Sequence, residues 1–228
     1  MSFSETSAVQ ERASALLSAL PDSVRLIAVS KYMPAQLIRA AYVAGLRDFG
    51  ESRIQEAIPK MAELEDLPDI TWHFIGHLQS NKAKLALRYF DWIHAVDSLA
   101  LAQRLNRMVG PEGRSPQLCL QVKVLPDPNK SGWSITALKK DLPGLQACTH
   151  LNWRGLMTIL PLGLTTQEAS AAFRLTQQLA VEISSNSPGE LRFQELSMGM
   201  SKDYLLAIQA GATMIRVGQG IFGDRPTP

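Results

Sequence analysis

The chain has 228 residues, of which 46% are hydrophobic and 19% are charged, as is typical of globular proteins. The net charge of +2 is close to neutral and the basic residues are scattered, so nucleic acid and acidic membranes are disfavoured as partners. No apolar run is long enough to span a bilayer, and residues 1–5 lack the features of a secretory signal. The two cysteines, Cys119 and Cys148, form no metal motif and indicate a reducing compartment, so we expect a cytoplasmic protein.

Short apolar runs that are typical of strands buried on both faces alternate with amphipathic stretches along the chain. A helical pattern over residues 7–20 precedes the first of these runs. The expected strands are residues 24–30, 47–50, 70–75, 92–96, 118–124, 155–159, 193–198 and 213–217.

Several local signals mark where the intervening helices begin and end. Gly45 supplies a left-handed stop after a helix over residues 34–44, and residues 97–98, Asp-Ser, cap a helix that carries Leu99, Ala102, Leu105 and Met108. Thr165 and Glu168 fit a capping box.

Two prolines and one serine give further expectations about these helices. Pro59 should kink or divide the helix that follows residue 52, and residues 143–144, Pro-Gly, should break the helix over residues 135–146. Ser201 should begin a helix that ends at Gly211.

Strands that alternate with helices predict parallel β/α units, and eight units in a chain of this length favour a closed barrel. We therefore expect an α/β protein with a single (β/α)8 TIM barrel, an extra N-terminal helix and a core over about residues 24–223. The first strand is not followed by Gly-x-Gly-x-x-Gly, which disfavours a dinucleotide-binding fold.

The carboxyl ends of all barrel strands share one face, where the active sites of such barrels form. The residues expected there are Lys31, Ser52, His77, Asn81, Met157, Met198, Ser201, Arg216 and Gly218. Lys31 directly follows the first strand, and a surface lysine at a strand end is the simpler interpretation of that position taken alone.

A phosphate site is expected after the seventh and eighth strands, where such barrels often bind phosphate. Ser201 offers a hydroxyl and nearby backbone N–H groups, and residues 218–220, Gly-Gln-Gly, let the backbone approach an anion closely. An N-cap serine and a glycine turn are the structural alternative.

One lysine beside a phosphate site indicates a phosphorylated carbonyl compound held as a Schiff base. A neutral amine is the nucleophile, so apolar surroundings and a nearby cation such as Arg216 would help by lowering the pKa of Lys31. At this level pyridoxal phosphate, as a bound cofactor, and a sugar phosphate, in a lysine aldolase, both remain open.

Six segments in register resemble the pyridoxal phosphate homeostasis protein family, which is itself similar to the barrel domain of alanine racemase. The segments are residues 28–31 (AVSK), 49–51 (FGE), 72–82 (WHFIGHLQSNK), 155–158 (GLMT), 196–204 (LSMGMSKDY) and 216–223 (RVGQGIFG). Each segment alone is weak evidence, but together they cover nearly the whole chain.

The resemblance implies that Lys31 forms the Schiff base with pyridoxal 5'-phosphate and that Arg216 faces the pyridine nitrogen. It also implies that Ser201 and the backbone of Gly218 and Gln219 hold the phosphate. Further candidate contacts to the cofactor are Met200, Ser52, His77 and Asn81. The sequence departs from the family at Ser52-Arg53, where Asn-Tyr is frequent, and at Gln219, where a backbone contact is unaffected.

The same resemblance favours a cofactor carrier over an enzyme. Other pyridoxal-phosphate-dependent proteins would receive the cofactor from it, and we expect no metal site. An arginine at the ring nitrogen disfavours its protonation and weakens the electron sink. Racemases of similar barrel type close the mouth with a second domain, and only five residues follow Gly223 here, so we expect an open mouth and a monomer. The alternatives are a small racemase-like enzyme and a lysine aldolase.

Overall fold

The computed structural model describes residues 3–111, 113–186 and 191–224. Its helices are α1 (Phe3–Ala19), α2 (Ala35–Val43), α3 (Ile54–Glu63), η1 (Ser80–Lys82, a 3-10 turn), α4 (Ala83–Tyr89), α5 (Leu99–Val109), α6 (Ile135–Gln146), α7 (Thr166–Asn186), α8 (Tyr204–Gln209) and α9 (Gln219–Phe222). Its strands are β1 (Arg25–Val29), β2 (Asp48–Glu51), β3 (Thr71–Phe74), β4 (Trp92–Val96), β5 (Gln117–Lys123), β6 (Trp133–Ser134), β7 (Asn152–Met157), β8 (Glu195–Met200) and β9 (Met214–Val217).

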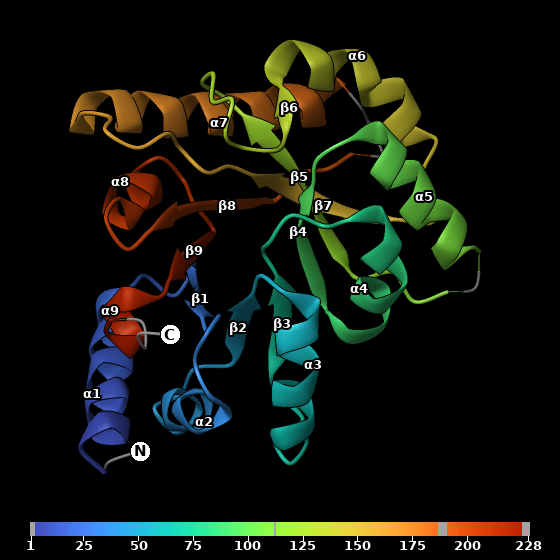
Figure 1. Ribbon diagram of the computed structural model, residues 1–228. Coiled ribbons are helices and arrows are strands. Elements are labelled where there is room, and N and C mark those ends of the chain that lie inside the picture. The colour runs from blue at the N-terminus through green and yellow to red at the C-terminus, as the bar shows by residue number, and fades with distance from the viewer. Residues whose placement is uncertain (1–2, 112, 187–190, 225–228) are drawn as a thin grey trace.

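Eight parallel strands among the described residues close into a barrel. The hydrogen-bonded order is β4-β3-β2-β1-β9-β8-β7-β5, and β4 also pairs with β5, which closes the ring. The helices surround the strands on all sides, and α1 and α9 lie beside each other at the periphery (Figure 1). The expected (β/α)8 barrel with an extra N-terminal helix is therefore confirmed.

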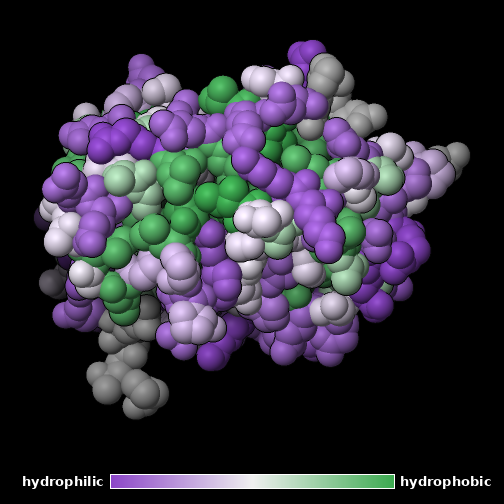
Figure 2. Space-filling view, turned by 90° about the horizontal axis from the view of Figure 1, so that it is seen from above, coloured by the Kyte–Doolittle hydropathy of each residue, from purple (hydrophilic) through white to green (hydrophobic). Residues whose placement is uncertain are grey.

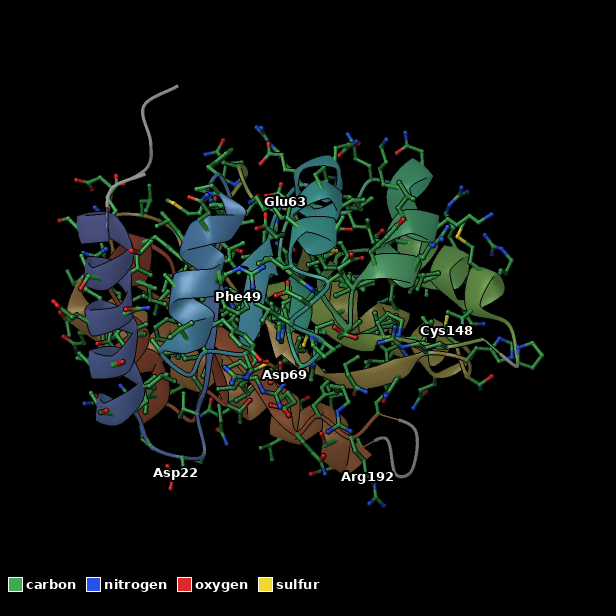
Figure 3. All side chains as sticks on the ribbon, turned by 90° about the horizontal axis from the view of Figure 1, so that it is seen from below. Asp22, Phe49, Glu63, Asp69, Cys148 and Arg192 are labelled. Carbon is green, nitrogen blue, oxygen red and sulfur yellow. The ribbon has the colours of Figure 1, made fainter. Side chains whose placement is uncertain are left out.

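The layer between strands and helices holds the main apolar core. Alternate strand residues such as Leu26, Ala28 and Phe49 are buried in one continuous cluster with residues of the surrounding helices. Phe49, labelled in Figure 3, is fully buried in this layer. Burial of about 25 cal/mol per Å² of apolar surface makes this layer the main source of stability.

The barrel interior is filled by the other alternate residues and is more polar. It holds a small apolar cluster of Ile27, Trp92, Ala95, Cys119, Met157 and Met214. Polar residues that are also buried include His73, His94, Ser197 and Arg216. The interior is therefore not a second apolar core, and its polar groups need partners within the barrel.

Most helix signals are confirmed. Ser98 Oγ accepts a hydrogen bond from Leu101 N, as an N-cap residue should, and Gly45 has a positive φ of 105° after α2. The reciprocal bonds of a capping box are present: Thr165 Oγ1 accepts from Glu168 N, and Glu168 Oε2 accepts from Thr165 N.

Neither proline interrupts its helix, so the expected break at Pro143 and the expected division at Pro59 are both wrong. Pro143 lies inside α6, which continues to Gln146 without a break, and Pro59 does not divide α3. Packing against the barrel holds both helices together although each proline removes one backbone donor.

Three further features of the structure differ from what the sequence pattern indicates. Ser201 does not begin a helix: it lies in a turn after β8, and α8 begins three residues later at Tyr204, with Asp203 as its N-cap. β6 is a two-residue strand beside β5 that the sequence pattern did not indicate. Met108 is 41% exposed, so it does not share the buried face of α5.

On the face that Figure 2 shows, hydrophilic side chains occupy most of the periphery and apolar side chains gather near the middle. Large apolar residues that are exposed lie in separate segments, such as Val43 in α2, Leu162 in the turn between β7 and α7, and Leu205 in α8. Among the described helices, none combines the length and the apolar character that crossing a membrane requires.

Candidate functional site

A cavity of about 450 Å³ lies at the carboxyl end of β1, β8 and β9. Its volume falls within the range of about 300–1,000 Å³ that is usual for small-molecule sites. The lining residues are Val29, Lys31, Met33, Met200, Ser201, Arg216, Gly218, Gln219, Gly223 and Asp224. Six of the nine cofactor-contact residues expected from the sequence are therefore together: Lys31, Met200, Ser201, Arg216, Gly218 and Gln219.

Lys31 reaches the cavity because it lies two residues beyond Val29, the last residue of β1, on the same side of the extended backbone as Val29, which also lines the cavity. The next residue, Tyr32, has a φ of +66°, and it is the only described residue other than glycine with a positive φ. A bulky side chain in this conformation costs about 1–2 kcal/mol, and such strain often marks functional sites. The tight turn after β1 therefore positions Lys31 at the expense of local backbone strain.

A buried ion pair holds the backbone beside Lys31. Lys60 on α3 donates from Nζ to the carbonyl of Ser30 at 2.9 Å and to Glu51 Oε1 at 2.8 Å. Ser30 Oγ donates to the same carboxylate oxygen at 2.7 Å. Because Ser30 and Lys31 share a peptide bond, α3 is fastened directly to the turn that carries Lys31.

Glu51 lies in an environment that disfavours its charge. Its side chain is fully buried, and Oε2 has no hydrogen-bond partner among the described residues. Burial raises the pKa of Glu51, while Lys60 and Ser30 partly oppose this effect.

The turn after β8 places Ser201 and Met200 at the cavity. Gly199 has a φ of +90°, and a Cβ atom at this position would lie 2.6 Å from the Cβ of Ala207. Asp203 Oδ1 accepts a hydrogen bond from Met200 N at 2.6 Å and holds the turn closed. Only glycine fits at position 199 without displacing α8, so this close packing fixes where Ser201 lies.

The turn after β9 brings the backbone of Gly218 and Gln219 to the same cavity. Gly218 is the N-cap of α9, and the Gln219 side chain donates from Nε2 to Oδ1 of Asp224, which lines the same cavity, at 2.7 Å.

Arg216 is the buried cation of the site. It is 3% exposed, donates from Nη1 to Ser197 Oγ at 2.6 Å and donates from Nη2 to the carbonyl of Thr158 at 2.8 Å. Burial lowers the pKa of Arg216 to about 10, which still leaves it a cation at neutral pH.

The structure does not bring the other three expected residues into this cavity. Ser52 and His77 line a separate pocket with residues such as Arg53 and Lys82. His77 contacts Asp97 at 3.0 Å and Ser131 at 3.2 Å, and Asn81 is an exposed residue of η1 that lines neither pocket. Ser52 directly follows β2, whereas His77 and Asn81 lie between β3 and α4, so a place after a strand does not by itself bring a residue to the cavity at β1 and β9.

Sequence reasoning also missed several residues of the site. Val29 could have been found, because it lies two residues before Lys31 on the same strand. Asp224 carries no such signal, since it enters the cavity only through the turn after α9.

Comparisons with known proteins agree with this arrangement. The family model for the alanine racemase N-terminal domain matches residues 5–226. The pyridoxal phosphate homeostasis protein of Synechocystis sp. is 52% identical over 212 residues, which cover 93% of this chain and 96% of that protein. The protein of the same name from Pseudomonas aeruginosa is 43% identical over 90% of this chain and 86% of its own length.

Solved structures agree on the fold. PipY of Synechococcus elongatus PCC7942, with PLP bound, has a TM-score of 0.90 and 56% identity, and covers 94% of this chain and 100% of that chain. Alanine racemase from E. faecalis has a TM-score of 0.74 at 18% identity, covering 98% of this chain and 61% of that one, and shows the shared fold alone.

Fold and cavity thus define a barrel of the alanine racemase N-terminal type with a lysine and a buried arginine at its mouth. More narrowly, the chain belongs to the pyridoxal phosphate homeostasis protein family. The resemblance stated from the six sequence segments is confirmed.

Proposed function

We propose that this protein binds pyridoxal 5'-phosphate in the cavity at the end of β1, β8 and β9 and serves in the homeostasis of that cofactor. The observation that carries the proposal is the convergence of Lys31, Arg216, Ser201 and the Gly218–Gln219 backbone on one cavity. The relative with PLP bound and the homeostasis proteins that cover nearly the whole chain support it.

The donor set in the cavity fits this ligand. Pyridoxal phosphate supplies a reactive aldehyde when bound, and Lys31 offers the amine that condenses with it to a Schiff base with loss of water. Ser201 offers a hydroxyl and Gly218 and Gln219 offer backbone N–H groups, which suit a phosphate. Arg216, held by two acceptors, is the group we assign to the ring nitrogen.

We further propose that the protein is a carrier and not an enzyme. A guanidinium at the ring nitrogen opposes the protonation that makes the ring a strong electron sink. Racemization also needs a proton donor or acceptor on each face of the substrate. Among the described residues that line the cavity, Lys31 and Asp224 are the only candidates, and no tyrosine, histidine or cysteine is present.

The remaining parts of the proposal concern the molecule as a whole. We propose that residues 1–228 form one domain and act as a cytoplasmic monomer that releases the cofactor to apoenzymes. The two free, buried cysteines fit a reducing compartment. A racemase-like enzyme is the alternative function, because Lys31 and Asp224 share the cavity. A lysine aldolase is the less favoured alternative, because the similar proteins are pyridoxal phosphate homeostasis proteins.

The absorbance spectrum of the purified protein with added pyridoxal phosphate tests the proposal. We expect a Schiff-base band in the wild type and its loss in Lys31→Ala, with Lys123→Ala as the matched control because Lys123 lies outside the cavity. A wild type that stays without this band, or a Lys31→Ala variant that keeps it, contradicts the assignment. Turnover of added amino acids by the loaded wild type would contradict the carrier role.

A further inference from the structure

A continuous row of hydrogen bonds crosses the barrel interior from Arg216 to Asp48. Arg216 Nη1 lies 2.6 Å from Ser197 Oγ, and Ser197 Oγ lies 2.8 Å from His94 Nδ1. His94 Nε2 lies 2.9 Å from His73 Nδ1, and His73 Nε2 lies 2.8 Å from Asp48 Oδ1. The members come from four different strands, β9, β8, β4 and β3, and the row ends on a fifth, β2.

The row passes through the centre of the barrel and not along its wall. Strands β4 and β8 are not neighbours in the ring, so the contact between His94 and Ser197 must span the interior. His73, His94 and Ser197 have no exposed surface, and Arg216 is 3% exposed. At its far end Asp48 lines a pocket with Arg25, Thr71 and Glu195, away from the cavity that holds Lys31.

The carboxylate end dictates the direction of the hydrogen bonds when both rings are neutral, and the guanidinium end is compatible with it. A guanidinium can only donate and a carboxylate can only accept. Asp48 therefore accepts from His73 Nε2–H, which leaves Nδ1 of a neutral His73 as an acceptor for His94 Nε2–H. Nδ1 of His94 is then an acceptor for the Ser197 hydroxyl, whose oxygen accepts from Arg216. The assignment agrees from both ends.

Burial favours the neutral rings that this direction requires. Desolvation is the largest cause that lowers the pKa of both His73 and His94, and it lowers that of His94 well below the usual value. If either ring were charged, His94 would have to donate from Nδ1 to Ser197 Oγ, and the Ser197 hydroxyl hydrogen would then have no acceptor within the row.

The row also limits how Arg216 can move. Nη1 is held by Ser197 and Nη2 by the carbonyl of Thr158, so the plane of the guanidinium is fixed at two nitrogens. Ser197 is itself held by His94, whose ring is held by His73. Ordering a long cationic side chain when a ligand binds weakens the binding affinity. Arg216 is already ordered before binding, so this cost is avoided.

We propose that Ser197, His94 and His73 are positioning residues that fix Arg216 at the base of the cavity, with Asp48 as the terminal acceptor. Through Arg216 they set how strongly the site discriminates a ligand with a pyridine nitrogen from one without it. This inference rests on the proposed binding of pyridoxal phosphate.

The test compares binding of pyridoxal 5'-phosphate with binding of its 1-deaza analogue, in which C–H replaces the ring nitrogen. Both ligands keep the aldehyde and the phosphate, so they differ only at the ring nitrogen. We expect wild type to prefer pyridoxal phosphate about tenfold, as for a hydrogen bond to a charged group, and Ser197→Ala to lose most of this preference. The difference in reactivity between the two aldehydes is the same for both proteins, so the change in the ratio reports the ring-nitrogen contact. Thr176→Ala is the matched control, because Thr176 is a buried hydroxyl that bonds only within α7.

A ratio that is unchanged in Ser197→Ala, or that falls equally in Thr176→Ala, overturns the inference while leaving the proposed function intact. A wild-type ratio near one overturns it as well, because Arg216 then makes no special contact with the ring nitrogen. Failure of wild type to bind either ligand would instead overturn the proposed function.

A second measurement needs neither ligand nor variant. Nitrogen NMR of the histidine-labelled wild type at neutral pH should show both buried rings neutral, protonated at Nε2 and not at Nδ1. A ring protonated at Nδ1, or a charged ring, at position 73 or 94 would contradict the assigned direction of the row.

Discussion

The layer outside the barrel strands and the interior inside them are built from alternate residues of the same strands, yet they differ in chemistry. Leu196 of β8 packs outward in the large apolar cluster, whereas its neighbour Ser197 belongs to the hydrogen-bonded row inside. In β9 the same contrast separates Ile215 from Arg216. Period-two alternation therefore separates apolar packing from polar positioning within single strands.

This difference teaches that stability and ligand recognition are carried by separate sets of residues. We therefore expect that truncating an apolar side chain of the outer layer leaves the hydrogen bonds near the cavity unchanged. The interior contributes fewer apolar contacts, and each of its polar members depends on the next. Three substitutions or conditions can break or sharpen this separation.

The largest effect should come from the outer layer. Phe173 on α7 is 1% exposed and lies in the main apolar cluster. Phe173→Ala should lower the free energy of unfolding by about 3–5 kcal/mol through lost burial and the cavity left behind. Urea unfolding measures this loss. Folded Phe173→Ala should bind pyridoxal phosphate as tightly as wild type, and a weaker affinity would show that the two regions are coupled.

The buried pair of Lys60 and Glu51 is the exception within the outer layer, and it should depend on pH. Lys60→Met leaves a buried carboxylate without its cation and should cost about 3 kcal/mol near neutral pH. Burial already raises the folded-state pKa of Glu51 above the usual 4.5. A raised folded-state pKa favours folding in acid, so the deficit should shrink as pH falls and grow as pH rises through the folded-state pKa.

Unfolding of Lys60→Met at several pH values, beside the double variant Lys60→Met/Glu51→Gln, measures this effect. The double variant has no carboxylate at position 51, so it should recover stability at neutral pH. A deficit independent of pH would show that Glu51 is not the group responsible.

The smallest effect should come from the barrel interior, as a decrease in the free energy of unfolding when the pH falls. Burial lowers the folded-state pKa of His73 and His94 below the usual 6.5. Below that value the unfolded chain takes up protons that the native rings do not. Stability is therefore fully present above pH 6.5 and is lost as pH falls, by up to about 1.4 kcal/mol per pH unit for each ring.

Urea unfolding of wild type and His94→Gln between pH 7 and 5 tests this prediction. The variant has one buried imidazole fewer, so its stability should fall less steeply with acidification. Parallel pH profiles would mean that His94 does not contribute to the acid slope.

Much of the fold followed from local sequence patterns. The strand residues 92–96 coincide with β4, and the caps at Ser98 and Thr165 are as expected, because a short polar side chain before an apolar helix face has few other roles. β6 could not be expected, since a two-residue strand has no periodicity and forms only where Trp133 meets β5. Likewise, only packing decides that α6 continues past Pro143.

The sequence pattern predicts which residues lie near the carboxyl ends of strands, and only part of the candidate site follows from that. Arg216 lies within β9 and Lys31 lies two residues beyond the end of β1, and the structure brings both to one mouth. Ser52 follows β2 directly yet lines a separate pocket with His77, and Asn81 lies in η1. Which of these residues share a cavity depends on contacts such as that of His77 with Asp97, and these contacts have no sequence signal.

By itself, the sequence determined the eight-strand alternation, the outward apolar faces and the chemical groups available at strand ends, because these depend on residue type and spacing. Only the tertiary structure decided which ends share a cavity and that His73 and His94 link Arg216 to Asp48. The physical reason is closure: residues far apart in the chain meet across the interior only after β4 pairs with β5.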